Sequence, residues 1–103
     1  MRLLVLYQAR DAAQDHPGYY HGFERLVQEG VLRAHVAIAY YQIAQQRGWD
    51  GLWAEAAQAA RAREADAIFL QWFHAKKMSD PTAGILRLKN LINRPTVAFM
   101  LGC

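Results

Sequence analysis

Four short apolar segments recur along the chain at intervals of roughly thirty residues, the usual length of one βαβ unit. They begin near residues 3, 35, 67 and 96, and the stretches between them carry apolar residues at helical spacing. Because strands and helices alternate throughout, the pattern predicts a parallel sheet with right-handed crossovers. We therefore expect residues 1–103 to form a single α/β domain of three layers, with a Rossmann-like, doubly wound sheet of about four strands.

The predicted strands are apolar on both alternations, as in strands covered on both faces. They are RLLVLYQ (2–8), AHVAIAYY (34–41), AIFLQWF (67–73) and TVAFML (96–101). The alanines of the second segment would also suit a continued helix. Gly30 punctuates the helix before it, however, and its β-branched and aromatic residues favour a strand.

The predicted helices occupy three of the intervening stretches, and residues 9–21 are expected to be a polar connection. The helices are expected over residues 22–32, 48–66 and 80–95. Asp50 is a candidate N-cap of the second helix. In the third, Asp80 is a candidate N-cap, with Pro81 at the first helical position.

The last predicted strand is apolar on both faces, yet no helix follows it in the sequence. In the common strand order 3-2-1-4, the first two helices cover one face of the sheet and only the third covers the other. An exposed strand of this composition would be a pairing hazard. We therefore expect a domain that is incomplete at its C-terminal edge. Either the chain is the front part of a longer protein, which we favour, or a second subunit pairs with the last strand.

The composition indicates a globular protein, with 53% apolar and 20% charged residues. The net charge is +3, but the basic residues are scattered, so no nucleic-acid partner is expected. The apolar run after Arg2 is too short for a signal peptide, and no stretch approaches the roughly 20 residues that span a bilayer. Cys103 is the single cysteine, which excludes an internal disulfide. We expect a cytoplasmic protein without a transmembrane segment.

Candidate ligand-binding residues lie in the connections that leave the carboxyl ends of the strands, where open parallel sheets bind ligands. In the first connection they are Asp15, His16, Tyr19, Tyr20 and His21. Their aromatic and hydrogen-bonding rings suit a sugar or a nucleoside. In the alternative interpretation Pro17 and Gly18 form a turn, the tyrosines pack on the sheet and the histidines are solvated.

His74 follows the third predicted strand, and Gly102 follows the fourth. At that position His74 can hydrogen-bond a ligand or act as a base, or it can be a solvated or capping residue. No metal site is expected, because the four histidines lack a ligand spacing such as HxxxH. The first strand is followed by neither GxGxxG nor GxxxxGK[ST], which argues against a self-sufficient dinucleotide or P-loop site. No GxSxG nucleophile elbow is present.

Three stretches of the chain resemble the amino-terminal half of bacterial two-domain glycosyltransferases. They are DHPGYYHGFERLVQEGVLRAHVAIAY, GWDGLWAEAAQAARAREADAIFLQWFH and RPTVAFMLG. The likeness is to the glycosyltransferase family 4 type and its spore-maturation-protein-like relatives, which have two facing Rossmann-like domains in the GT-B arrangement. In that family the amino-terminal domain mainly holds the acceptor, and the carboxy-terminal domain holds the nucleotide sugar. The resemblance covers nearly the whole chain as an order of strands, loops and helices.

This resemblance implies the acceptor-side segment of an enzyme that transfers a sugar from a nucleotide-sugar donor. It places His16, Tyr19, His21 and His74 at the interdomain cleft, with His74 as the candidate catalytic residue, and Gly102 at the start of the next cleft loop. The implied partners are a sugar-acceptor small molecule or glycan and a C-terminal donor-binding domain. The chain alone is then expected to be inactive and to hold no cofactor, whereas the full-length enzyme would take the nucleotide sugar.

A second class of protein also fits the predicted fold. It is a small flavodoxin-like or receiver-like module that binds a ligand or regulates a partner, and that forms a homodimer through its last strand. A further α/β domain after Leu101 would favour the enzyme, and a natural stop there would favour the module.

Overall fold

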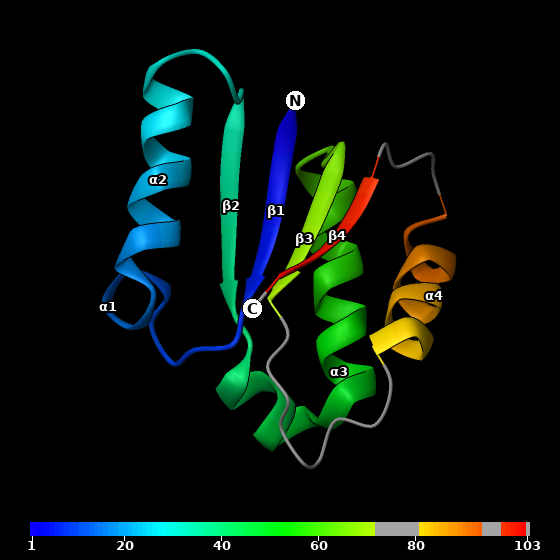
Figure 1. Ribbon diagram of the computed structural model, residues 1–103. Helices are drawn as coiled ribbons and strands as arrows, with labels where there is room; N and C mark the ends of the chain where they lie inside the picture. The colour runs from blue at the N-terminus through cyan, green and yellow to red at the C-terminus, as the bar shows by residue number, and fades with distance from the viewer. Residues whose placement is uncertain (72–80, 94–97, 103) are drawn as a thin grey trace.

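The computed structural model describes residues 1–71, 81–93 and 98–102 as an α/β unit built on one parallel sheet (Figure 1). Its strands are β1 (Arg2–Tyr7), β2 (Ala34–Ala39), β3 (Ala67–Gln71) and β4 (Ala98–Gly102). Its helices are α1 (Ala12–Asp15), α2 (Pro17–Gln28), α3 (Tyr41–Ala62) and α4 (Pro81–Ile92). The predicted fold class, α/β with a parallel sheet, is confirmed.

The strands lie in the order β2-β1-β3-β4, which differs from the order 3-2-1-4 considered above. β1 is central and pairs with both β2 and β3: Leu3 lies opposite His35 on one side and Ala67 on the other. The chain that leaves β2 therefore crosses over β1 through α3 and adds β3 on its far side, rather than adding a strand beyond β2. β2 and β4 form the two edges of the sheet.

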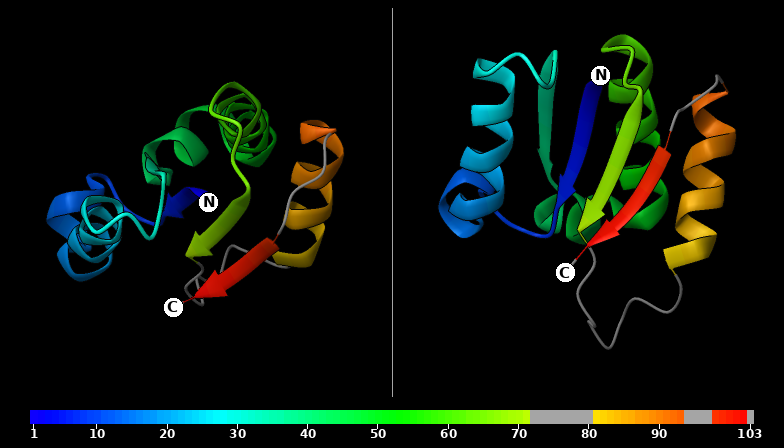
Figure 2. Two further views of the ribbon diagram at one scale, coloured as in Figure 1. Left: turned by 90° about the horizontal axis from the view of Figure 1, so that it is seen from above. Right: turned by 45° about the horizontal axis from the view of Figure 1, so that its top comes forward.

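The helices cover the sheet on both faces, with α2 on one and α3 and α4 on the other (Figure 2). Alternate side chains of β1 separate the two cores, because successive residues of a strand point to opposite faces. Val5 and Tyr7 face α2, and Leu4 and Leu6 face α3 and α4. The order 3-2-1-4 would have put the first two helices on one face. In the structure, one helix pair lies on each face.

The segment expected to be a polar connection, residues 9–21, is largely helical. The side chain of Asp11 caps α1 by accepting a hydrogen bond from the backbone N–H of Gln14. Pro17 then occupies the first turn of α2, where its missing N–H leaves no helical hydrogen bond unmade. The prediction missed α1 and the beginning of α2, whose later part falls in the helix predicted over residues 22–32, because Pro17 and Gly18 are also typical of a turn.

α3 consists of two helices that meet in a kink at Gly48, whose φ of 71° and ψ of 178° are not helical. The second helix follows Gly48, where the sequence predicts a helix start, whereas the first, from Tyr41, was not predicted. A positive φ of this kind is accessible to glycine at little cost. Asp50, the candidate N-cap, lies just after the kink, inside the first turn of the second helix rather than before it. Beyond the kink, Trp49 stacks against Trp53, with ring centroids 6.1 Å apart.

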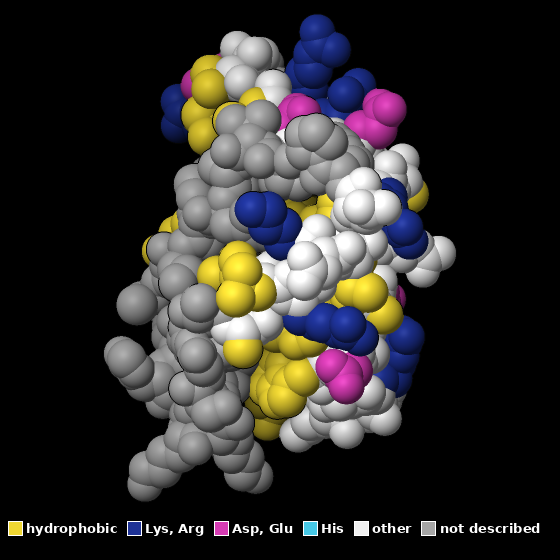
Figure 3. All heavy atoms as spheres, turned by 90° about the vertical axis from the view of Figure 1, so that its right-hand side faces the viewer, with side chains coloured by type: hydrophobic (Ala, Val, Ile, Leu, Met, Phe, Trp, Pro, Cys, Tyr) yellow, Lys and Arg dark blue, Asp and Glu magenta, His cyan; other side chains and the backbone are white. Residues whose placement is uncertain are grey.

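α3 and α4 approach closely at Gly84, where a Cβ atom would lie 2.4 Å from Cζ2 of Trp53. A glycine is needed for this contact, because any side chain would collide with the indole ring. Seen from the side of α4, the described hydrophobic side chains form several separate groups with Lys and Arg side chains between them (Figure 3). The predicted capping role of Asp80 lies outside the described residues.

Candidate functional site at the carboxyl edge of the sheet

The carboxyl ends of β1 and β3 lie side by side at the centre of the sheet. β1 is followed by α2 on one face, whereas β3 is followed by α4 on the opposite face. Neighbouring strands whose connections depart to opposite faces leave a crevice between their carboxyl ends, and open α/β sheets bind ligands at such crevices. Two glutamines lie at the carboxyl ends of these strands: Gln8 follows β1, and Gln71 is the last residue of β3.

A closed ring of hydrogen bonds joins these two glutamines to His16, the residue between α1 and α2. The backbone N–H of Gln8 donates to Oε1 of Gln71 at 3.1 Å. Nε2 of Gln71 lies 3.3 Å from Nδ1 of His16, and Nε2 of His16 lies 3.0 Å from the carbonyl oxygen of Gln8. The ring ties the first connection to the end of β3.

The hydrogen-bonding roles within this ring follow from the backbone of Gln8. A carbonyl oxygen only accepts, so Nε2 of His16 carries the proton that it donates to Gln8. Nδ1 of His16 then accepts from the amide nitrogen of Gln71. Both imidazole nitrogens are thus engaged within the protein, and in this arrangement His16 positions the loop and does not offer a nitrogen to a ligand.

Gln71 is a buried polar side chain, with 1% of its surface exposed. Its backbone carbonyl also accepts a hydrogen bond from the hydroxyl of Tyr40, at 2.7 Å. Burial raises the pKa of Tyr40 above its ordinary value, so its hydroxyl remains a donor at neutral pH. Tyr40 follows β2, and the ends of β1, β2 and β3 are therefore linked by polar contacts.

Asp15 closes the loop that precedes His16. Its Oδ2 accepts the backbone N–H of Arg10 at 2.9 Å and that of Asp11 at 3.3 Å. These two hydrogen bonds lower the pKa of the Asp15 carboxyl below its ordinary value. The side chain predicted to contact substrate thus holds the backbone of its own loop.

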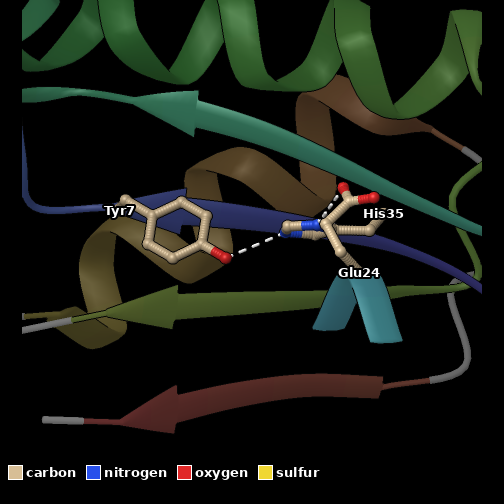
Figure 4. A network of polar contacts seen from close by, with 3 residues as sticks. All are labelled: Tyr7, Glu24 and His35. Carbon is tan, nitrogen blue, oxygen red and sulfur yellow. Dashed lines mark hydrogen bonds and ion pairs between the residues drawn. The ribbon is translucent and has the colours of Figure 1, made fainter. Parts of the chain in front are cut away.

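A second polar network lies beneath α2 and joins Tyr7, His35 and Glu24 (Figure 4). The hydroxyl of Tyr7 lies 2.8 Å from Nε2 of His35, and Nδ1 of His35 lies 2.9 Å from Oε1 of Glu24. The His35 side chain is completely buried, whereas 40% of the Glu24 side chain is exposed. Burial, together with the nearby Tyr20 and Glu24, raises the pKa of Tyr7, so its phenol is neutral. With a neutral imidazole, Tyr7 donates to His35 and His35 donates to Glu24.

Tyr20 takes part in the packing around this second network. Its ring centroid lies 5.2 Å from that of His35 and 6.3 Å from that of Tyr7. Tyr20 therefore packs on the sheet, as the alternative interpretation of the sequence expected.

Tyr19 and His21 occupy other sides of α2. Tyr19 is 41% exposed, stacks on Phe23 at 6.3 Å between ring centroids, and contacts the ring of Phe69 on β3 at 5.9 Å. His21 is exposed, and its ring meets the edge of Tyr20. These two side chains are the members of the predicted set that present aromatic surface to solvent.

The predicted site residues are therefore distributed around the start of α2. His16 lies at the ends of β1 and β3, Tyr20 points inward, and Tyr19 lies toward β3. Gly102 is the last residue of β4 and pairs in register with Gln71, which brings it to the same edge of the sheet. His74 lies outside the described residues.

Sequence reasoning missed Gln8, Glu24, His35 and Gln71. The available signal was a polar residue inside an apolar segment: His35 in AHVAIA and Gln71 in AIFLQWF. A polar side chain on a buried strand needs a partner, and in this fold the partners come from α2 and from the loop before it.

The described residues contain no group of three or more His, Cys, Asp or Glu side chains placed to hold a metal ion. Over the same part of the chain, no helix combines the length and the apolar character needed to cross a membrane. Comparison with protein-family models, with curated proteins and with solved structures found no match to this chain.

Proposed function

We propose that the chain is the N-terminal, acceptor-side segment of a glycosyltransferase that uses a nucleotide-sugar donor. The observation that carries the proposal is that the carboxyl ends of β1 and β3 are neighbours while their helices lie on opposite faces, because the connection rich in His and Tyr begins there. In this proposal the sheet belongs to the doubly wound, Rossmann-like class, which its parallel strands and its two helical faces support. The resemblance of the sequence to two-domain transferases supplies the reaction.

Within this proposal Tyr19 and His21 contact the acceptor, while Asp15 and His16 position their loop. An exposed tyrosine ring suits a sugar, because its face can stack on the apolar C–H face of a pyranose. His74 is the proposed base for the acceptor hydroxyl, and a donor-binding domain supplies the contacts to the nucleotide. The segment is proposed to act in the cytoplasm and to transfer no sugar without that domain.

The proposal is tested on the complete reading frame that contains these residues. Its protein is assayed for transfer from a panel of nucleotide sugars, and residues 1–103 are assayed in parallel. We expect transfer by the longer protein alone. Tyr19→Ala should raise KM for the acceptor at least about tenfold, because one stacking contact of about 1.4 kcal/mol is lost. The KM for the donor should not change. Arg63→Ala, at the exposed end of α3, is the matched control. A native stop at Cys103, or a longer protein that binds no nucleotide sugar, would contradict the proposal.

The strand order favours a second candidate, a flavodoxin-like or receiver-like module. The order β2-β1-β3-β4 is the beginning of the flavodoxin-like order 2-1-3-4-5, in which the ligand lies between β1 and β3. In this candidate two copies associate through β4, an edge of the sheet. Sedimentation of residues 1–103 at increasing concentration, with and without a flavin mononucleotide, tests it. A concentration-dependent dimer that binds the flavin supports the module, and a monomer that binds none contradicts it.

A further inference from the structure

We infer that His16 is a proton-sensitive latch, which holds residues 8–16 against the end of β3 only while its imidazole is neutral. The observation is the closed ring of hydrogen bonds through Gln8, Gln71 and His16. Two of its groups have fixed roles, because the Gln8 N–H only donates and the Gln8 carbonyl only accepts. The inference concerns the chain itself and does not depend on sugar transfer.

Protonation of His16 leaves one contact of the ring unsatisfied. The imidazolium donates from both nitrogens, so the hydrogen bond from Nε2 to Gln8 persists, but Nδ1–H now faces the amide N–H of Gln71. Turning that amide over would present Oε1 to His16. The amide nitrogen would then face the Gln8 N–H, which is also a donor. Either orientation places two donors together.

Burial makes this conflict costly. Gln71 is 1% exposed, so water has little access to satisfy the displaced donor. Loss of the ring removes the described hydrogen bonds that join Gln8 and His16 to the end of β3. The other described hydrogen bonds of the connection run elsewhere: Asp15 accepts from Arg10 and Asp11 within the loop, and the Ala9 carbonyl accepts from the Tyr41 N–H of α3.

Some charged groups around His16 stabilise its protonated form and others destabilise it. Asp15, its neighbour in sequence, attracts an imidazolium, and Arg10 in the same loop repels one. Both side chains are exposed, which weakens their effect. From β1, the neutral ring of Tyr7 stacks on His16 with centroids 6.3 Å apart, and Tyr7 separates it from His35 of β2. Among the described residues of β3, Gln71 faces His16, and it is uncharged.

The direction of the pH dependence follows from proton counting. The latched state binds one proton fewer at His16 than the released state, so a fall in pH favours release. The comparison is therefore made between pH 8 and pH 5, the interval over which histidine residues in general change charge. Acidification would thus release residues 8–16 from the end of β3.

The test measures hydrogen-exchange protection of the Gln8 N–H in the full chain by NMR at pH 8 and pH 5. After correction for the intrinsic exchange rate, we expect a loss of protection of at least about tenfold at pH 5, with a parallel shift of the Gln71 side-chain amide. Equal protection at the two pH values would overturn the inference.

Two variants of the ring and one control sharpen this test. His16→Gln keeps one donor and one acceptor but cannot titrate, so protection should become independent of pH. In Gln71→Glu, a carboxylate accepts from both the Gln8 N–H and the imidazolium, which should reverse the direction of the effect. His21→Gln should behave like the parent chain. If His16→Gln retains the parent's pH dependence, the inference is wrong, and this comparison decides the matter even if Gln71→Glu does not fold.

Discussion

The imidazole of His35 is removed from water completely, although imidazole is a polar group that must find partners when buried. It finds them in the Tyr7 hydroxyl below and the Glu24 carboxylate at the surface. The rings of Tyr20 and Phe23 enclose it, with centroids 5.2 and 5.3 Å away. His35 is therefore the residue through which α2 is fixed to β1 and β2.

Replacing His35 by Ala should destabilise the protein by about 2–4 kcal/mol. The change leaves a cavity under α2 and deprives the buried Tyr7 hydroxyl of its partner. Glu24→Gln is the matched control. It keeps an acceptor for His35 at a half-exposed position, and it should cost about 1 kcal/mol or less. Urea unfolding measures both, and an equal or larger loss for Glu24→Gln would contradict the assigned role of His35.

Asp15 should contribute stability that depends on pH in the acid range. Its folded-state pKa is lowered, so the contribution is complete above the unfolded value and disappears as the pH falls through the folded value. Asp15→Asn should therefore be less stable than the parent chain near neutrality, and the difference should vanish in strong acid. Thermal unfolding from pH 7 down to pH 2 measures it. A difference that stays constant over this range would assign the effect to something other than the charge.

The sequence indicated that the stretch around Asp15 and His16 is rich in polar chemistry, but not which side chains point inward. The residue types were visible, whereas their orientation depends on the helical phase of α2. Once α2 begins at Pro17, Tyr20 and Glu24 are one turn apart and face His35, and Tyr19 is directed to Phe69. The sequence did not show where α2 begins, because a proline followed by a glycine is equally typical of a turn. The inward-facing side chains of α2 could therefore not be predicted.

At the scale of the elements, the contact between α3 and α4 depends on the absence of a side chain at one position. Gly84 lies against the indole ring of Trp53. Trp53 in turn is buried and stacked on Trp49 just beyond the kink of α3. The indole ring therefore cannot move away without disturbing the first turns after Gly48.

Gly84→Ala should destabilise the protein by about 1–3 kcal/mol, the usual cost of overpacking a core. The control is Gly22→Ala in α2, where a new Cβ meets nothing within 4 Å. There alanine should stabilise the helix by up to about 1 kcal/mol, because glycine is the poorer helix former. Chemical unfolding of the two variants should give changes of opposite sign. A shared sign would contradict the close packing at Trp53.

The boundaries of the strands were largely predictable, and the boundaries of the helices were less so. β1 and β2 coincide with apolar segments that have few alternatives. α3 was predicted from residue 48 because Gly48 and Asp50 together suggest a helix start. In the structure a helix does follow Gly48, but another helix, which begins at Tyr41, precedes it, and Gly48 accommodates the change of direction between the two.

At the scale of the whole molecule, the alternation of strands and helices was sufficient to predict the fold class but not the strand order. Both 3-2-1-4 and 2-1-3-4 satisfy the same apolar pattern, since each buries its central strands on both faces. What distinguishes them is whether β3 pairs with the outer edge of β2 or with the free edge of β1, and no local signal in residues 67–71 encodes that choice. The pairing of Leu3 with Ala67 therefore had to come from the structure.

The position of β1 has a consequence for how the protein is made. β1 precedes both of its neighbours, β2 and β3, in the chain, so it leaves the ribosome before either of them. β1 therefore gains its second edge partner only after residue 71 has been translated, and every pairing it makes closes a long loop. A nascent chain that ends before β3 exposes one edge of a strand as apolar as RLLVLY, which is a template for aggregation.

We expect purified residues 1–66 to be digested by a nonspecific protease much faster than residues 1–103 under identical conditions. Comparable resistance of the two chains would show that β1 and β2 with their helices are already stable without β3. If the expected difference is found, synthesis of this protein includes an interval in which chaperones are needed to keep the open edge of β1 from aggregating.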